Sequence, residues 1–206
     1  MRYLNRIVFI NSAAIPYAEI LLDGNIHFIG TQGVGKSTIL RAILYFYNAD
    51  TRHLGMPKGP TSKNFTEWYL AYANSYIVYE VARETGAYCV LAFKSQNRVC
   101  FRFIDTAYLP KYFMNDAGEV FANWERIRER LDADRVNVTG MVTSYEEYRD
   151  ILYGNFTGKA EFRKYALLEA KQYNTIYRTI QNVFLNTKLD AAEIKQTIIS
   201  SMDVDD

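Results

Sequence analysis

The chain has 206 residues, 49% of them hydrophobic, which is enough for one globular domain with a buried core and a small further lobe. Its 24 Lys and Arg residues nearly balance 23 Asp and Glu residues, so the net charge of +1 excludes a strong overall field for nucleic acid or acidic lipid. The apolar runs are too short to span a membrane, which predicts a cytoplasmic protein without membrane contact.

The first third of the chain predicts three strands and one helix. The strands are short apolar runs at 6–10, 17–22 and 26–29, and the last two are separated by the turn residues Asp23, Gly24 and Asn25. A glycine-rich loop follows, and apolar residues at helical spacing then predict a helix that is buried on most sides and ends near Asn48. Closely spaced glycines and prolines predict an irregular surface loop over residues 51–74.

The middle of the chain predicts an antiparallel meander. Strand-like runs at 75–82, 87–94 and 98–104 are joined by connections of only a few residues, whereas a parallel pair needs a crossover of about a dozen or more. In the third run, apolar residues alternate with Arg98 and Arg102. This alternation predicts one covered face and one wetter face.

The remainder of the chain predicts helices. An apolar stripe from Val120 to Leu131 indicates an amphipathic helix, and Ser144 with Glu147 indicates the capped start of another. A long helix is expected from about 160 to 186, and a last helix is expected to end near Met202.

One motif carries chemistry. It fits the pattern G-x-x-x-x-G-K-[ST] and stands directly after a predicted strand and directly before a predicted helix. Its glycines allow backbone N–H groups and the helix N-terminus to face phosphates, while Lys36 would bridge the β- and γ-phosphates and Ser37 would bind Mg²⁺. The sequence therefore predicts a site for ATP with Mg²⁺. Its residues are Gly30, Thr31, Gln32, Gly33, Val34, Gly35, Lys36, Ser37 and Thr38.

Hydrolysis also requires an acidic residue that organises the metal and the attacking water. Asp105 follows an apolar run, but Arg102 interrupts that run and Thr106 stands where a catalytic glutamate is expected. The sequence also lacks the S-G-G signature that completes a composite nucleotide site. We therefore assign no catalytic residue and interpret the chain as half of an ATPase.

The segment from Leu4 to Tyr47 resembles the N-terminal half of SMC-type heads, which belong to the ABC ATPases, although Gln32 stands where these heads commonly have asparagine. The stretch from Phe162 to Leu185 resembles the helical region before the coiled coil of MukB-like and JetC-like proteins. The resemblance implies an α/β P-loop NTPase fold of the ABC/SMC-head type. Its mixed sheet would contain the antiparallel meander, and a helical C-terminal region would follow.

The same resemblance implies a division into a P-loop lobe, residues 1–110, and a mostly helical extension towards a coiled coil, residues 111–206. ATPase activity would require the C-terminal half of the same head and a second head, which are absent from this chain. The larger machine would act on DNA in chromosome organisation, repair or defence against foreign DNA. The identity of the Q-loop glutamine stays open among four positions. These are Gln96, Gln172, Gln181 and Gln196.

Two alternatives stay open. A self-contained small P-loop kinase or NTPase would carry the same motif, but such kinases use parallel sheets with crossover helices, and the meander favours antiparallel pairing. A module in which ATP binding only gates contact with a partner is the other alternative.

Three further patterns favour structural roles. Arg126, Arg128 and Arg130 alternate with glutamates, which is typical of a solvated helix face rather than a DNA contact. The 17 tyrosines are spread over strands and helices, which favours packing over a base-stacking platform. The two cysteines, Cys89 and Cys100, lie in strand-like runs and are expected to be reduced core residues.

Overall fold

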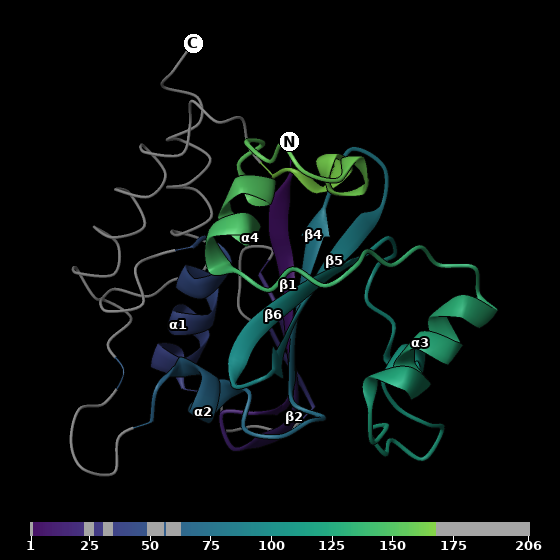
Figure 1. Cartoon of the computed structure of the whole chain (residues 1–206). Coiled ribbons are helices and arrows are strands. Elements are labelled where there is room, and N and C mark those ends of the chain that lie inside the picture. The colour runs from purple at the N-terminus through teal and green to yellow at the C-terminus, as the bar shows by residue number, and fades with distance from the viewer. Residues whose placement is uncertain (1, 23–26, 31–34, 49–55, 57–62, 168–206) are drawn as a thin grey trace.

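The computed structural model describes residues 2–22, 27–30, 35–48, 56 and 63–167. Over these residues the backbone forms one six-stranded sheet with the order β3-β2-β1-β4-β5-β6 (Figure 1). The strands are β1 (Tyr3–Ser12), β2 (Ile15–Leu21), β3 (His27–Gly30), β4 (Tyr76–Ala82), β5 (Ala87–Ser95) and β6 (Arg98–Ile104). All of the strands predicted from apolar runs are confirmed, with β1 and β2 longer than expected.

Each neighbouring pair of described strands is antiparallel. The predicted meander β4-β5-β6 is therefore confirmed. The expected mixed sheet is wrong for the strands that the structure describes. The chain leaves β3 at the edge of the sheet and returns to the centre at β4, which runs antiparallel to β1, so β3 gains no parallel neighbour among them.

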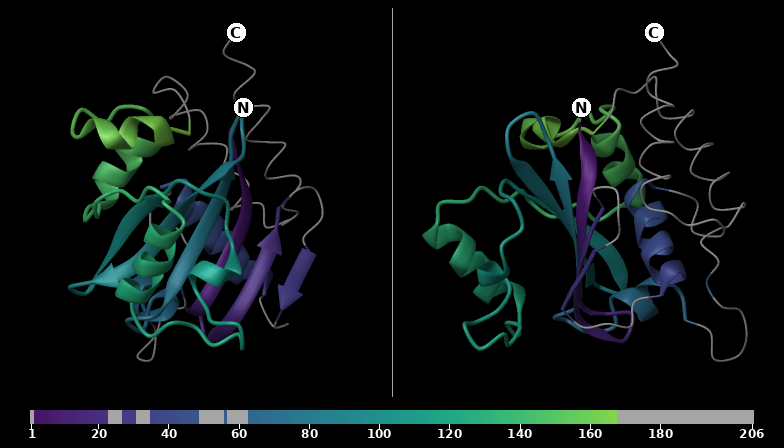
Figure 2. Two further views of the ribbon diagram at one scale, coloured as in Figure 1. Left: turned by 90° about the vertical axis from the view of Figure 1, so that its right-hand side faces the viewer. Right: turned by 180° about the vertical axis from the view of Figure 1, so that it is seen from behind.

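Helices cover both faces of this sheet. The helical elements are α1 (Lys36–Phe46), α2 (Phe65–Tyr69), α3 (Trp124–Ala133) and α4 (Tyr145–Leu152), with short 3-10 helices η2 (Pro110–Tyr112) and η3 (Ala160–Tyr165). Seen from the side and from behind, α1, α2 and α4 lie on one face and α3 lies on the other (Figure 2).

The strand residues alternate between two buried clusters. Ile7, Phe9 and Tyr79 belong to the cluster that includes α1 and α4, whereas Val8 and Val78 belong to the cluster that includes α3. Because both faces of the central strands are covered, these strands are apolar on both sides even though they are antiparallel.

The face of β6 that was expected to be wetter is covered as well. The Arg102 guanidinium lies 4.8 Å from the ring centre of Trp124 in α3 and 5.6 Å from that of Phe93. Burial, together with the nearby charge of Arg128, lowers the pKa of Arg102. The alternation in β6 therefore marks a second packed layer, in which an arginine stacks on aromatic rings.

One loop prediction and one helix prediction need correction. The stretch predicted to be irregular contains α2, which begins with a reciprocal capping box between Asn64 and Glu67. Helix α3 begins only after its N-cap residue Asn123, and Val120 instead forms an isolated bridge with Met114. In both cases an asparagine cap marks the true start of the helix.

The C-terminal predictions are tested only in part. Helix α4 begins where expected, and Ser144 accepts hydrogen bonds from the backbone N–H groups of Glu146 and Glu147. The long helix expected from Ala160 is wrong over its first residues, because η3 is a 3-10 helix that ends at Tyr165. The rest of that helix and the one ending near Met202 lie outside the described residues.

Other expectations concern the whole chain. Both cysteines are buried and free, as predicted, and burial raises the pKa of Cys89. Helix α1 precedes residue 110 and helix α4 follows it, and both pack on the same face of the sheet. The division of the chain at residue 110 stays a prediction. Within the described part of the chain, no helix is long and apolar enough to cross a membrane.

We expect the fold to be lost in strong alkali through its buried tyrosines. Burial raises the pKa values of Tyr79 and Tyr148 well above the usual value. Their contribution to stability is therefore complete below the unfolded pKa of about 10 and is lost as pH rises towards the folded pKa. Tyrosinate absorbance and circular dichroism, recorded together from neutral pH upwards, should change in one cooperative step. Complete ionisation of the tyrosines with unchanged circular dichroism would contradict this expectation.

Candidate functional site

The phosphate-binding motif lies between an edge strand and a buried helix. Gly30 is the last residue of β3 and pairs with Ala18 of β2, and Lys36 is the first residue of α1. The predicted strand and the predicted helix therefore flank the motif in the predicted order. The residues Thr31, Gln32, Gly33 and Val34 lie outside the described residues, and only the backbone of Lys36 is described.

The N-terminus of α1 is open to an anion. Gly35 is its N-cap residue, and the Gly35 carbonyl accepts hydrogen bonds from the N–H groups of Thr38 (3.1 Å) and Ile39 (3.2 Å). There is no side-chain cap and no acidic residue in the first turn of α1. The first N–H groups of a helix have no partner within it and carry partial positive charge, so this end can bind phosphate oxygens.

Two further details fit a phosphate ligand and its metal. A Cβ atom built on Gly35 would meet no heavy atom within 4 Å, so the described side of the loop leaves space for a ligand. Ser37, the expected Mg²⁺ ligand, is exposed in the first turn of α1. In the described part of the chain, no group of three or more His, Cys, Asp or Glu residues could hold a metal ion.

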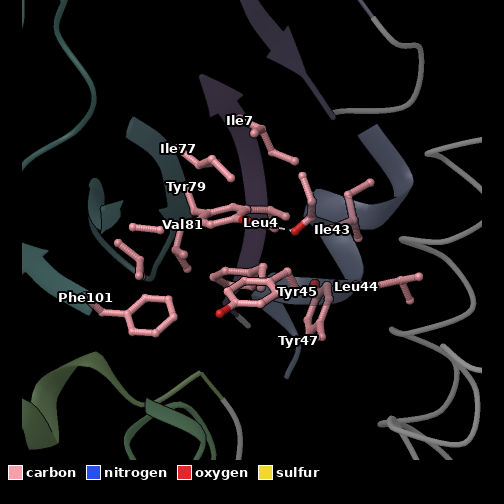
Figure 3. Packing of buried hydrophobic residues seen from close by; sticks show 14 of the residues in the cluster. Leu4, Ile7, Ile43, Leu44, Tyr45, Tyr47, Ile77, Tyr79, Val81 and Phe101 are labelled. Atoms are coloured by element: carbon pink, nitrogen blue, oxygen red, sulfur yellow. Dashed lines mark hydrogen bonds between the residues drawn. The ribbon is translucent and has the colours of Figure 1, made fainter. Parts of the chain in front are cut away.

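Tyrosine hydroxyl groups hold α1 at several points along its length. The Tyr69 hydroxyl of α2 donates to the Thr38 carbonyl at 2.9 Å, and the Tyr79 hydroxyl of β4 donates to the Ala42 carbonyl at 2.8 Å. Figure 3 shows Tyr79 pointing from β4 towards α1. Burial raises the pKa of Tyr69 to about 12, even though Arg41 acts to lower it, so this hydroxyl stays protonated and can donate at neutral pH. The sequence suggested packing for the tyrosines but not these hydrogen bonds.

The only acidic residue weighed for hydrolysis lies far from the loop. Asp105 follows β6, which forms the opposite edge of the sheet from β3. With about 4.8 Å between neighbouring strands, these edges are roughly 24 Å apart. The registers also place Gly30 level with Phe101 of β6, so Asp105 is displaced from the loop along the strands as well as across them.

Asp105 instead takes part in ion pairs. It binds Arg83, and Lys164 donates to it at 2.9 Å. Burial alone would raise the pKa of Asp105, but the hydrogen bonds and charges of Arg83 and Lys164 outweigh this effect and lower it. Asp105 therefore connects β6 to η3 and has no place in a nucleotide site.

The remaining candidates are placed as follows. In α3, Arg126 pairs with Glu129 and Arg128 pairs with Asp132, and all four side chains are more than half exposed, which confirms a solvated face. Gln96 lies in the turn between β5 and β6, on the far side of the sheet from β3. The other glutamines considered for the Q-loop lie outside the described residues.

Comparison with known proteins gives one match. Residues 11–206 match the family model described as "Protein of unknown function (DUF3584)", and this range includes the whole phosphate-binding motif. The search of curated proteins and the search of solved structures each found no match.

We expect Asp105→Asn to leave ATP affinity unchanged and to lower stability by about 1 kcal/mol or less, because its ion pairs are partly exposed. The pKa of Asp105 is lowered in the folded state, so the wild-type advantage should be present at neutral pH and disappear as pH falls through the folded pKa. Urea unfolding of both proteins at neutral and acidic pH measures this. Loss of ATP binding in a folded Asp105→Asn variant would contradict its assignment as a structural residue.

Proposed function

The chain belongs to the DUF3584 family, and we propose that it binds ATP with Mg²⁺ through the loop from Gly30 to Thr38. The observation that carries this proposal is the uncapped N-terminus of α1, which directly follows the glycine motif. Phosphate recognition requires unpaired N–H groups and close backbone approach, and the described residues Gly35 and Ser37 leave both possible.

Each part of the motif has a separate role in this proposal. The backbone N–H groups at the start of α1 hold phosphate oxygens, and Lys36 adds a positive charge at the β- and γ-phosphates. Ser37 supplies a hydroxyl oxygen to Mg²⁺, which neutralises phosphate charge when it is bound. Tyr69 and Tyr79 hold the helix that presents these groups.

We further propose that the chain is the N-terminal half of an SMC-like ATPase head. The antiparallel meander and the loop on an edge strand support this proposal, because an acidic strand that completes the site would then be added beside β3. The distance between Asp105 and the loop supports it too, since hydrolysis then depends on residues from elsewhere. The completing elements would be the later half of the head and a second head.

In this proposal the larger assembly is an ATP-driven machine that acts on DNA in chromosome organisation, repair or defence. The near-zero net charge of the chain and the paired arginines of α3 indicate weak, non-specific DNA contact by the chain itself. Specific DNA contact would therefore come from the assembly.

The alternative is a self-contained small P-loop kinase or NTPase. Such an enzyme needs its acidic residue on a strand next to the loop strand, usually in a parallel sheet. The one described neighbour of β3 is β2, and this pair is antiparallel. The described sheet therefore favours the half-head over the complete enzyme.

Lys36→Ala should abolish ATP binding without unfolding the chain, because α1 is held by Ile39, Ile43 and Phe46 in the core and the substitution touches none of them. Ser37→Ala should retain binding but lose most of its dependence on Mg²⁺. Calorimetric titration with and without Mg²⁺ measures both effects. Lys159→Ala, an exposed lysine outside the motif, is the matched control. Unchanged ATP affinity in a folded Lys36→Ala variant would overturn the proposed function.

The purified chain should hydrolyse ATP far more slowly than about 1 s⁻¹, the lower end for working enzymes. Asp105, the carboxylate weighed for catalysis, lies at the opposite edge of the described sheet from β3. Stabilisation of the transition state by this chain alone is therefore expected to be incomplete. Steady-state phosphate release is the measurement, and Lys36→Ala is the control for contaminating ATPase. Turnover above this rate that disappears in Lys36→Ala would favour the complete enzyme instead.

A further inference from the structure

The C-terminal end of α1 is bound to α4 by tyrosine hydroxyl groups. Tyr145 donates to the Tyr45 carbonyl at 2.8 Å, Tyr148 donates to the Phe46 carbonyl, and Tyr153 donates to the Tyr47 carbonyl at 2.8 Å. In return, the Asn48 side chain donates to the Tyr145 carbonyl at 2.9 Å. The two helices are therefore joined through consecutive backbone carbonyls at the end of α1.

These carbonyls are the ones that most need outside donors. The last carbonyl groups of a helix have no partner within the helix, and α1 has no basic residue in its last turn. Tyr148 and Tyr153 are fully buried, so water cannot easily replace their hydroxyl groups. The Tyr45 carbonyl also accepts the Asn48 N–H, but a shift of α1 away from α4 would remove the tyrosine donors of the Phe46 and Tyr47 carbonyls. The two helices are therefore expected to move together.

Stacked aromatic rings extend this connection to the start of α1. Tyr45 stacks on Tyr145 at 4.5 Å between ring centres and on Phe65 of α2 at 3.8 Å, and Phe65 stacks on Tyr69 at 4.3 Å. Tyr69 in turn binds the Thr38 carbonyl in the first turn of α1. Contacts therefore run without a gap from the end of the phosphate-binding loop to α4.

The far end of α4 is bound to the chain that follows η3. The N–H group of Leu167 donates to the Leu152 carbonyl at 2.7 Å, and Leu167 is the last described residue before residues 168–206. η3 also packs against the sheet, because Tyr165 stacks on Phe103 at 5.1 Å and its carbonyl accepts the Tyr88 hydroxyl. A displacement of α4 would therefore act directly on the point where the chain continues.

From this geometry we infer that α4 transmits the nucleotide state of the loop at one end of α1 to the chain that follows Leu167. The inference rests on the proposed ATP binding. Tyr145, Tyr148 and Tyr153 are positioning residues in it, because they contact α1 and not the nucleotide. Nucleotide that tightens the first turn of α1 would stabilise α4 through these hydroxyl groups. By linkage, anything that holds α4 in place would also favour nucleotide.

The test is hydrogen exchange of the peptide that covers residues 145–153, with and without ATP and Mg²⁺. In the wild-type chain, ATP should slow exchange there by about fivefold or more, the lower end of typical coupling between two sites. The triple variant Tyr145→Phe, Tyr148→Phe and Tyr153→Phe should bind ATP but lose this response. Tyr112→Phe is the matched control, since it removes a tyrosine hydroxyl that donates to Asp134 at the end of α3, on the other face of the sheet, and its α4 response should be retained.

Calorimetry on the same samples separates the possible failures. If the wild-type chain binds ATP but exchange in α4 does not change, the inference is overturned and the proposed function stands. If the triple variant does not fold, the single variants Tyr145→Phe and Tyr153→Phe replace it and should each weaken the response. A full response in both single variants would overturn the inference. A wild-type chain that does not bind ATP would overturn the proposed function and the inference together.

Discussion

Hydrogen bonds from tyrosine hydroxyl groups to the backbone of α1 are the interaction on which the rest of the structure depends. They come from the sheet through Tyr79, from α2 through Tyr69 and from α4. Because α1 begins at the end of the proposed phosphate-binding motif, these bonds fix the position of its first turn relative to the sheet. They also explain the burial of Tyr69, Tyr79, Tyr148 and Tyr153, since each places an apolar ring in the core and a donor at a carbonyl of α1 or its C-cap.

The order of the strands separates the loop from Asp105. The loop follows β3 at one edge of the sheet, and Asp105 follows β6 at the other. Phosphate binding needs only the loop and the helix, whereas hydrolysis needs an acidic group beside them. The described sheet therefore fits a protein that holds nucleotide by itself and depends on further polypeptide for catalysis. A connection from α1 to α4 would give such a protein a way to signal that nucleotide is bound.

Local sequence patterns predicted much of this fold, but they could not predict the long-range contacts. Apolar runs located every described strand, and the glycine motif located the end of β3 and the start of α1. The β1–β2 turn was missed because it consists of Ala13 and Ala14, which adopt left-handed φ angles of 52° and 59° without the usual glycine or asparagine. The α4 tyrosines bind carbonyls 100 to 106 positions away, and no spacing rule predicts such pairs. The mixed sheet came from the family resemblance rather than from the strand pattern.

Recognition of phosphate by the loop and the N-terminus of α1 is the central claim of this account. The most direct measurement is competition against labelled ATP in the presence of Mg²⁺, with inorganic triphosphate and adenosine as the two competitors. The account predicts that triphosphate displaces ATP and that adenosine at the same concentration does not, because the backbone N–H groups bind phosphate oxygens. Displacement by adenosine with no effect of triphosphate would contradict it.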